Sequence, residues 1–285
     1  MTTFVYADGR IVEGDRAVIP VLDLSVLRGY GVFDFLRTYG RHPFRLRDHL
    51  QRFVASARVV DLTLPLSLDE VADVIRRLLM KVSYPEANIK VFLTGGESSD
   101  QYLPEGDGRF FALVYPVSPH SSTIYEEGIV LTKTIYQRPF PEAKTIHYFP
   151  AIVAIRKARS RGAEDVLFTD AEGAVLETGT ANFFGIKGGR IITPDRRIIS
   201  GITRKVVLEL CEREALPVEV RPVAVGELAG FEGAFITSGS RGIVPVSRVD
   251  EKSYPVHPLA RRLIALFAEY TRSIKDPFPD FAPIS

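Results

Sequence analysis

The chain has 285 residues, 46% of them hydrophobic and 25% charged, which is typical of a globular protein with a substantial core. Its formal net charge of +1 gives no electrostatic reason to bind nucleic acid or an anionic membrane surface. No apolar run approaches the roughly 20 residues that span a bilayer, and the N-terminus lacks the pattern of a secretory signal, so a cytoplasmic protein is expected.

The first half of the chain predicts a hairpin, two helices and two strands. Asp8-Gly9, between two short apolar runs, is typical of a tight type I′ turn. Ser67 and Glu70 have the spacing of a capping box at a helix start. The elements expected here are a hairpin over 4–12, helices over 46–60 and 67–82, and strands over 89–94 and 110–117.

The second half continues this alternation. It predicts strands over 129–134, 165–169, 182–186, 191–193 and 234–237, and helices over 149–161, 202–214 and 258–273. The short polar segment 118–123 contains Pro119 and is the candidate linker. The expected organisation is an N-terminal α/β domain over 1–117, a linker over 118–123 and a C-terminal α/β domain over 124–285.

The single cysteine, Cys211, excludes an intrachain disulfide. Its neighbours form the apolar side of the helix expected over 202–214, and free cysteine behaves as a small hydrophobe. A buried structural thiol is therefore predicted. No metal site is expected.

Lys144 lies in an aromatic, proline-containing stretch, 141–148, where an ammonium is expensive to bury. One reason for a lysine there is covalent, because a lysine whose charge is suppressed can form a Schiff base with an aldehyde. Glu177, about thirty residues further on, would be the acid that pairs with a pyridinium nitrogen. The two residues predict a pyridoxal-phosphate site.

Three other segments are suited to an anion. Residues 201–204 open a helical pattern, so the amides of Ile202 and Thr203 are donors at a positive dipole end. The loop 237–242 has small hydroxyl residues and glycines that let a phosphate approach the backbone. Arg52 could hold a phosphate through a bidentate contact. Each also has a plain structural interpretation: a capped helix, a turn and a surface arginine.

In their order along the chain, these motifs resemble the class IV aminotransferases. This fold-type IV pyridoxal-phosphate family includes branched-chain aminotransferases, D-amino acid aminotransferases and aminodeoxychorismate lyases. The resemblance runs from Asp8 to about Val249. It is carried by 28–34, 49–52, Lys144 with Tyr148, 177–184, 201–204 and 237–242.

The resemblance implies an α/β fold of two domains, a smaller N-terminal one and a larger C-terminal pseudo-barrel that carries most of the cofactor site. It also implies a homodimer that acts on an amino acid and a 2-oxo acid. Lys144 would bind the cofactor and move the substrate proton, Glu177 would keep the pyridine nitrogen protonated, and Tyr148 would bond the phenolic oxygen. The residues implied at the phosphate are Arg52, Ile202, Thr203, Gly239 and Ser240.

Two positions depart from the family pattern. His147 stands where many relatives have asparagine, and Asp34-Phe35 replaces the Glu-Gly that is common in branched-chain enzymes. Both positions are expected close to the substrate pocket, so they bear on specificity rather than on the cofactor chemistry.

The substrate carboxylate needs a cationic or donor-rich trap. Arg28 stands where branched-chain relatives have a tyrosine, and Lys90 where they tend to have an arginine; the Arg-x-His pair of the best-known D-amino acid enzymes is absent. The main hypothesis is a D-amino acid transaminase in which Arg28, assisted by Lys90, binds the carboxylate beside Tyr30 and Phe33. In the alternative use of Arg28, it pairs with an internal acid such as Asp34.

Other functions stay open at this point. A branched-chain L-amino acid transaminase would use Tyr30, Phe33 and Tyr148 as an apolar cage. An aminodeoxychorismate lyase would release pyruvate without a second keto acid. The chain could also be a catalytically inactive ligand-binding relative, although Lys144 and Glu177 are both present.

Overall fold

The computed structural model of this protein describes residues 2–274. These residues form two compact units. Unit 1 comprises 2–118, 143–147 and 271–274, and unit 2 comprises 119–142 and 148–270. The segment that carries Lys144 thus clusters with unit 1, although the residues before and after it in the sequence belong to unit 2. The expected domain limits and linker stay predictions, and the C-terminal limit at 285 lies outside the described residues.

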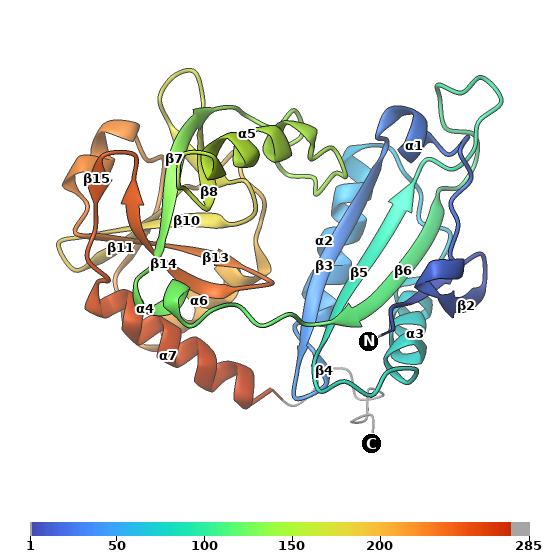
Figure 1. Cartoon of the computed structure of the whole chain (residues 1–285), viewed down its shortest axis with the longest axis horizontal. Helices are drawn as coiled ribbons and strands as arrows, with labels where there is room; N and C mark the ends of the chain where they lie inside the picture. Colours follow the sequence, from blue (N-terminus) through green and yellow to red (C-terminus); the bar gives the residue numbers. More distant parts are fainter. Residues whose placement is uncertain (1, 275–285) are drawn as a thin grey trace. The chain divides into compact units, whose positions relative to one another are not determined.

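Unit 1 is built on a six-stranded antiparallel sheet with the order β2-β1-β6-β5-β3-β4. The strands are β1 (Phe4–Ala7), β2 (Arg10–Glu13), β3 (Gly31–Tyr39), β4 (His42–Pro43), β5 (Ala87–Thr94) and β6 (Arg109–Pro116). The helices are α1 (Leu24–Arg28), α2 (Leu46–Val59) and α3 (Leu68–Leu79), with a 3₁₀ turn η1 (Gly14–Arg16). In Figure 1 this unit runs from blue to green, and α2 and α3 lie along its sheet.

The local signals in unit 1 are confirmed. Asp8 and Gly9 have φ values of 47° and 78°, and they connect Ala7 and Arg10, which are paired across β1 and β2. Such left-handed values at both central residues define the type I′ turn. At the start of α3, the capping box is complete: Ser67 accepts from the Glu70 amide and its own amide donates to the Glu70 carboxylate.

The two faces of this sheet differ. One face carries fully buried side chains that pack with α2 and α3 in one core, including Val32, Leu36 and Ile89. The opposite face is only partly buried and carries a stack of aromatic rings across three strands. The alternation follows from the period of two along a strand.

Unit 2 is built on a nine-stranded sheet with the order β12-β11-β10-β13-β14-β7-β8-β9, and β15 pairs with β14. Its strands are β7 (Ile129–Ile135), β8 (Asp165–Thr169), β9 (Val175–Thr178), β10 (Asn182–Lys187), β11 (Arg190–Thr193), β12 (Val218–Val220), β13 (Gly233–Ser238), β14 (Gly242–Val249) and β15 (Lys252–Ser253). Its helices are α4 (Thr123–Glu126), α5 (Phe149–Arg159), α6 (Ile202–Arg213) and α7 (Pro258–Arg272), with a 3₁₀ helix η2 (Val225–Gly230). Strand β9 also pairs with β10, so the strands from β10 through β13, β14, β7 and β8 to β9 close on themselves. This closure is the pseudo-barrel expected for the C-terminal half.

The strand β14 escaped prediction because Pro245 interrupts its apolar run, and a central strand rarely contains proline. Cys211 is fully buried on α6, as expected, and burial raises the pKa of its thiol to about 11. Within residues 2–274, no helix has the length and apolarity to cross a membrane.

Candidate active site

The backbone of Lys144 is fixed from two sides within unit 1. Its amide donates to Oγ of Ser56 on α2 at 3.0 Å, and its carbonyl accepts from the amide of Phe33 on β3 at 2.9 Å. Two residues on, the amide of Ile146 donates to the carbonyl of Gly31 at 3.0 Å. A Cβ on Gly31 would lie 3.1 Å from the Ile146 side chain and 2.9 Å from a backbone oxygen, so glycine permits this close approach.

The side chain of Lys144 lies against the aromatic face of the sheet. Its Nζ is 4.6 Å from the ring centroid of Phe33. Phe33 stacks on Phe92 at 5.8 Å between centroids, and Phe92 stacks on Phe111 at 4.8 Å with an interplanar angle of 10°. These three residues are paired directly across β3, β5 and β6, which explains the stack. A half-buried amine therefore lies beside an extended apolar surface.

Arg52 binds the Asp34 carboxylate through two nitrogens. Nε donates to Oδ2 at 2.9 Å and Nη2 donates to Oδ1 at 2.8 Å. Asp34 is fully buried on β3, and His49 Nδ1 lies 2.7 Å from the same Oδ1. Burial alone would raise the pKa of Asp34, but the charge of Arg52 and the hydrogen bonds of Arg52 and His49 outweigh it and hold the pKa below its usual range.

The same cluster keeps His49 neutral at physiological pH. Burial lowers the pKa of His49, Asp34 opposes this change, and the positive charges of Arg52 and Lys144 lower the pKa further. Because the charge of Lys144 affects the pKa of His49, the lysine and this cluster interact electrostatically within unit 1. The alternative in which Arg28 pairs with Asp34 does not hold, because Arg52 and His49 bind that carboxylate.

In unit 2, Glu177 is buried on β9 and its two oxygens have different partners. Oε1 accepts from Nε of Arg138 at 2.9 Å and lies 2.7 Å from Nη2 of the same arginine. Oε2 accepts from the amide of Ile199 at 3.0 Å. Arg138 also donates to the carbonyl of Pro141 at 2.7 Å. The carboxylate is thus held in one orientation by an ion pair and a backbone donor.

Asn182 supports this arrangement structurally. It pairs with Glu177 across β9 and β10, at the contact that closes the sheet of unit 2. Its Nδ2 donates to the carbonyl of Ile199 at 3.0 Å. A Cβ on Gly201 would lie 1.9 Å from Oδ1 of Asn182, so the residue before α6 has to be glycine. The position of Glu177 and the start of α6 are therefore coupled.

The two segments of unit 2 that were considered for an anion each have a defining hydrogen bond. The first helical bond of α6 runs from the Lys205 amide to the Gly201 carbonyl at 2.9 Å, so the amides of Ile202 and Thr203 precede the helical ladder. In the loop 238–242, the amide of Arg241 donates to Ser238 Oγ at 3.3 Å.

A buried hydroxyl borders that loop. Oγ1 of Thr237 is shielded from solvent, and within residues 2–274 it has no hydrogen-bond partner. Buried hydroxyls are normally paired. An orphaned donor beside a loop of small residues fits a site for an anion.

The two tyrosines expected at the site, Tyr148 and Tyr30, belong to different units. Tyr148 precedes α5 and packs against a core cluster of unit 2, while His147 is exposed. Tyr30 is tied into unit 1, because its hydroxyl donates to the carbonyl of Val60. Burial and nearby Asp61 raise the pKa of Tyr30.

The two cations expected at the substrate carboxylate have different neighbours in unit 1. Arg28 ends α1, is exposed, and lies 5.6 Å from the ring centroid of Tyr102. Lys90 lies on β5, with Nζ at 5.5 Å from the ring centroid of Tyr115. Lys90 is also the cross-strand partner of Phe35, on the sheet face that carries the aromatic stack. The assignment of both to substrate binding stays a prediction.

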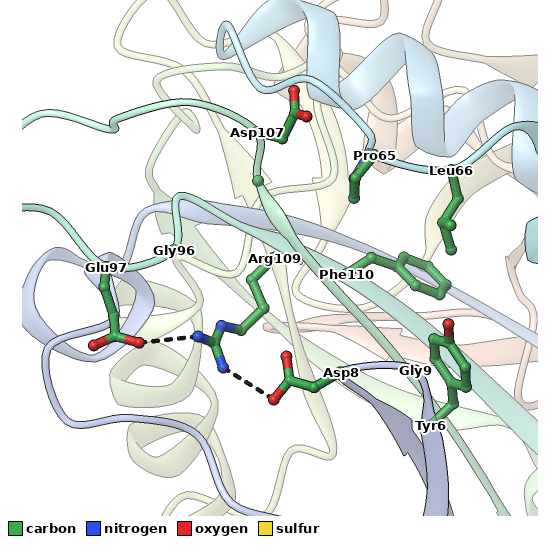
Figure 2. A pocket seen from close by; sticks show the side chains of 11 residues that line it. Tyr6, Asp8, Gly9, Pro65, Leu66, Gly96, Glu97, Asp107, Arg109 and Phe110 are labelled. Carbon is green, nitrogen blue, oxygen red and sulfur yellow. Dashed lines mark hydrogen bonds and ion pairs between the residues drawn. The ribbon is translucent and has the colours of Figure 1, made fainter.

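A hollow of unit 1 lies between an apolar wall that includes Leu66 and Phe110 and a charged wall (Figure 2). In the charged wall, Arg109 contacts Glu97 at 2.9 Å and Asp8 at 3.3 Å. None of the residues predicted for the site lines this hollow. Arg109 pairs with both acids, which is the pattern of a structural ion-pair cluster.

Sequence reasoning missed Arg138, the partner of Glu177. It lies in a proline-containing loop with no recognised motif around it, so only its contact with the carboxylate reveals it. Within residues 2–274, no group of three or more His, Cys, Asp or Glu side chains is arranged to hold a metal ion.

Comparison with known proteins gives one consistent result. The sequence pattern described as amino-transferase class IV matches residues 31–249, most of the chain. A putative branched-chain-amino-acid aminotransferase of Methanocaldococcus jannaschii is 28% identical, with 97% of this chain and 95% of that protein covered. A D-alanine aminotransferase of Listeria monocytogenes is 24% identical, with coverages of 86% and 87%. The fold is similar to that of the branched-chain aminotransferase of the thermophilic archaeon Thermoproteus uzoniensis, solved with norvaline: the TM-score is 0.89, the identity 23%, and 95% of each chain is covered.

Proposed function

The chain belongs to the class IV aminotransferase family, and from that premise we propose that it is a pyridoxal-phosphate-dependent transaminase of amino acids with apolar side chains. The observation that carries this proposal is the position of the Lys144 amine beside the Phe33–Phe92–Phe111 stack. Such a surface suits a hydrocarbon side chain, because burying apolar area is favourable and burying a second carboxylate is costly. Most of the relatives found by sequence, including that of Methanocaldococcus jannaschii, are named as branched-chain-amino-acid aminotransferases.

The residues present fit pyridoxal phosphate in chemical type. A phosphate is a suitable ligand for the leading amides of α6, at Ile202 and Thr203, and for the loop that holds Gly239 and Ser240. The orphaned hydroxyl of Thr237 borders the same loop. Arg52 is the further phosphate contact that we propose, and its two bonds to Asp34 would keep the guanidinium in a fixed plane.

When bound, the cofactor supplies an aldehyde for a lysine and a ring that withdraws electrons. In our proposal Lys144 would hold the cofactor through its amine, and the amine, once displaced by that of the substrate, would take up the proton of the substrate Cα and later release it. The fixed backbone of Lys144, bonded to Ser56 and Phe33, limits the positions that the amine can reach. Glu177 holds the proton on the pyridine nitrogen, and Tyr148 donates to the phenolic oxygen.

A half-reaction tests both the chemistry and the substrate. Purified protein loaded with pyridoxal phosphate is mixed with single amino acids, without a keto acid, and the visible absorbance of the bound cofactor is followed. Rapid bleaching by L-leucine or L-valine, with D-alanine and D-glutamate inert, is the expected result. Release of pyruvate from aminodeoxychorismate, with no dependence on a keto acid, would instead identify a lyase. Protein that takes up no cofactor would contradict the proposal as a whole.

A second candidate, a D-amino acid transaminase, is favoured by Arg28. This arginine is exposed at the end of α1. Asp34, its alternative ion-pair partner, is bound by Arg52 and His49 instead. A guanidinium available to solvent can bind a substrate carboxylate, with Lys90 in support. Bleaching by D-alanine or D-glutamate, lost in Arg28→Ala but retained in the control Arg58→Ala, is the result that this candidate requires.

We further propose that the protein works as a homodimer in the cytoplasm. Exposed apolar side chains gather in unit 1 around α1, at Val18, Val21, Leu22, Val26 and Leu103. A patch of this kind on a stable protein commonly marks an interface, and a second copy of the chain is the occupant that we propose. Sedimentation of wild type and Val26→Lys tests this: the wild type is expected as a dimer and the variant as a monomer with the same secondary structure. A wild-type monomer at micromolar concentration would contradict it.

A further inference from the structure

Asp165 is a buried carboxylate of unit 2 that neither the cofactor chemistry nor the core requires. It begins β8 and is 2% exposed. Its Oδ1 accepts from the amide of Val166 at 2.8 Å. Its Oδ2 accepts from the hydroxyl of Thr180 at 2.8 Å and from that of Thr178 at 3.3 Å. A carboxylate buried at this depth has to be paired, so its partners are informative.

Arg241 supplies the positive charge. One of its terminal nitrogens, Nη2, donates to the hydroxyl of Thr180 at 2.7 Å and lies 3.4 Å from Oδ2 of Asp165. The side chains of the ion pair are only 15% and 3% exposed. The backbone of the arginine is also held, because its carbonyl accepts from the hydroxyl of Tyr125 at 3.1 Å. Side chain and backbone of Arg241 therefore anchor one loop.

This network joins two segments that the proposed chemistry uses at opposite ends of one ligand. Thr178 follows Glu177 directly, and Arg241 follows Gly239 and Ser240 directly. Asp165 contacts Thr178, the residue after the acid, and Arg241, which lies within the loop 238–242. One carboxylate thus contacts the segment of the proposed ring-nitrogen partner and that of the proposed phosphate donors.

The side chain of Asp165 is tightly packed against the neighbouring turn. A Cβ on Gly179 would lie 2.8 Å from Oδ1 of Asp165 and 2.7 Å from the side chain of Ile155. The turn from Thr178 to Thr180 therefore lies directly on the carboxylate and could not shift without a clash. A binding site gains affinity when its loops are held in the bound geometry before the ligand arrives.

We propose that Asp165 and Arg241 are a positioning pair that fixes the phosphate loop, 238–242, relative to Glu177. The inference rests on the proposed pyridoxal-phosphate function. Neither residue is assigned to the cofactor itself. Their effect is exerted through Thr178, Thr180 and the backbone of the loop, so it falls on the phosphate end of the ligand.

The test compares pyridoxal phosphate with pyridoxal, which lacks the phosphate. Wild type, Arg241→Gln, Arg241→Lys and Asp165→Asn are freed of cofactor and titrated with each compound, with absorbance as the readout. Arg248→Gln, on the same strand as the end of the loop, is the matched control. Thr180→Val, which removes only the bridging hydroxyl, serves in place of Asp165→Asn if that variant does not fold.

Arg241→Gln and Asp165→Asn are expected to bind pyridoxal phosphate about tenfold more weakly, the size of effect of one charge-assisted hydrogen bond. Their affinity for pyridoxal should stay within about twofold of wild type on the same reasoning. Arg241→Lys, which keeps the charge, should recover part of the loss. The melting temperature of each cofactor-free protein separates this effect from a general loss of stability.

Two failures can be told apart. Equal losses for both compounds, or none for either, would overturn the positioning role while the proposed function stands. A wild-type protein whose absorbance with pyridoxal phosphate equals that of Lys144→Ala would refute the proposed function itself, and this role with it.

Discussion

Arg138 and Glu177 meet at a single carboxylate oxygen: Oε1 of Glu177 is 2.9 Å from Nε and 2.7 Å from Nη2 of the arginine. The other oxygen is taken by the amide of Ile199. The acid is thus held in one orientation in a mostly buried setting, which suits the role that we propose for it at a ring nitrogen. Arg138 fixes the orientation of Glu177 through a contact from outside the motif, as we propose that Asp165 fixes the phosphate loop.

Removing Arg138 should destabilise the protein more than removing the whole pair. Arg138→Met leaves a buried carboxylate without its charge partner, which costs about 3 kcal/mol of unfolding free energy. The double variant Arg138→Met/Glu177→Gln should recover part of this loss, because the remaining amide carries no charge. Urea unfolding of the cofactor-free proteins measures both, and additive effects would contradict the coupling.

Lys144→Ala should abolish the lysine-dependent visible absorbance of added pyridoxal phosphate and lower transamination by at least about a thousandfold, since the nucleophile is lost. Lys157→Ala, on α5, is the control that keeps both. Ser56→Ala should leave the absorbance in place but slow the half-reaction, because the Lys144 amide loses its acceptor. An active Lys144→Ala variant would rule out the assigned role.

The stability of the protein should fall as the pH drops below about 6.5. His49 is neutral in the folded state because its pKa is lowered, whereas in the unfolded chain it takes up a proton near its ordinary pKa of about 6.5. The unfolded state then binds more protons, so the free energy of unfolding decreases with pH, by at most about 1.4 kcal/mol per pH unit for one group. Asp34, with its lowered pKa, should add a second loss below about pH 4, where the unfolded carboxyl takes up a proton.

Urea unfolding from pH 4 to pH 8 tests this pH dependence. His49→Gln, which cannot titrate, should flatten the slope between about pH 5 and 6.5. His120→Gln, at an exposed position, should leave the slope as it is. Equal slopes for wild type and His49→Gln would show that another group is responsible.

The capping box of α3 offers a test without any link to the site. Ser67→Ala removes the side chain that accepts from the Glu70 amide and should lower the unfolding free energy by about 1 kcal/mol. Ser67→Asp, which keeps an acceptor, should be close to wild type. Both variants should retain wild-type activity, measured in the half-reaction.

Gly201→Ala should weaken the site through Asn182. The added Cβ would lie 1.9 Å from Oδ1 of Asn182, so either the start of α6 or the strand beside Glu177 has to move. We expect weaker binding of pyridoxal phosphate and a lower melting temperature. Gly226→Ala is the matched control, since a Cβ there meets nothing within 4 Å. An unchanged affinity in Gly201→Ala would show that the close contact is not needed.

The sequence by itself determined whatever depends on neighbours along the chain. The turn at Asp8-Gly9 needs two left-handed residues, and the cap at Ser67 needs a carboxylate three residues on. Both depend only on adjacent residues in the sequence, and both are confirmed. The order of motifs around Lys144 and Glu177 likewise identified the family, as the match over residues 31–249 confirms.

Only the tertiary structure decided which charges meet. Asp34 pairs with Arg52 and His49 rather than with Arg28, and Arg138 finds Glu177 across 39 positions of sequence. Buried ions have to be paired, but the identity of the partner depends on which strands and helices come together. The sheet of unit 2 pairs strands that are distant in the sequence, and it closes where β9 pairs with β10. The local sequence of a strand does not indicate which distant strand it will pair with.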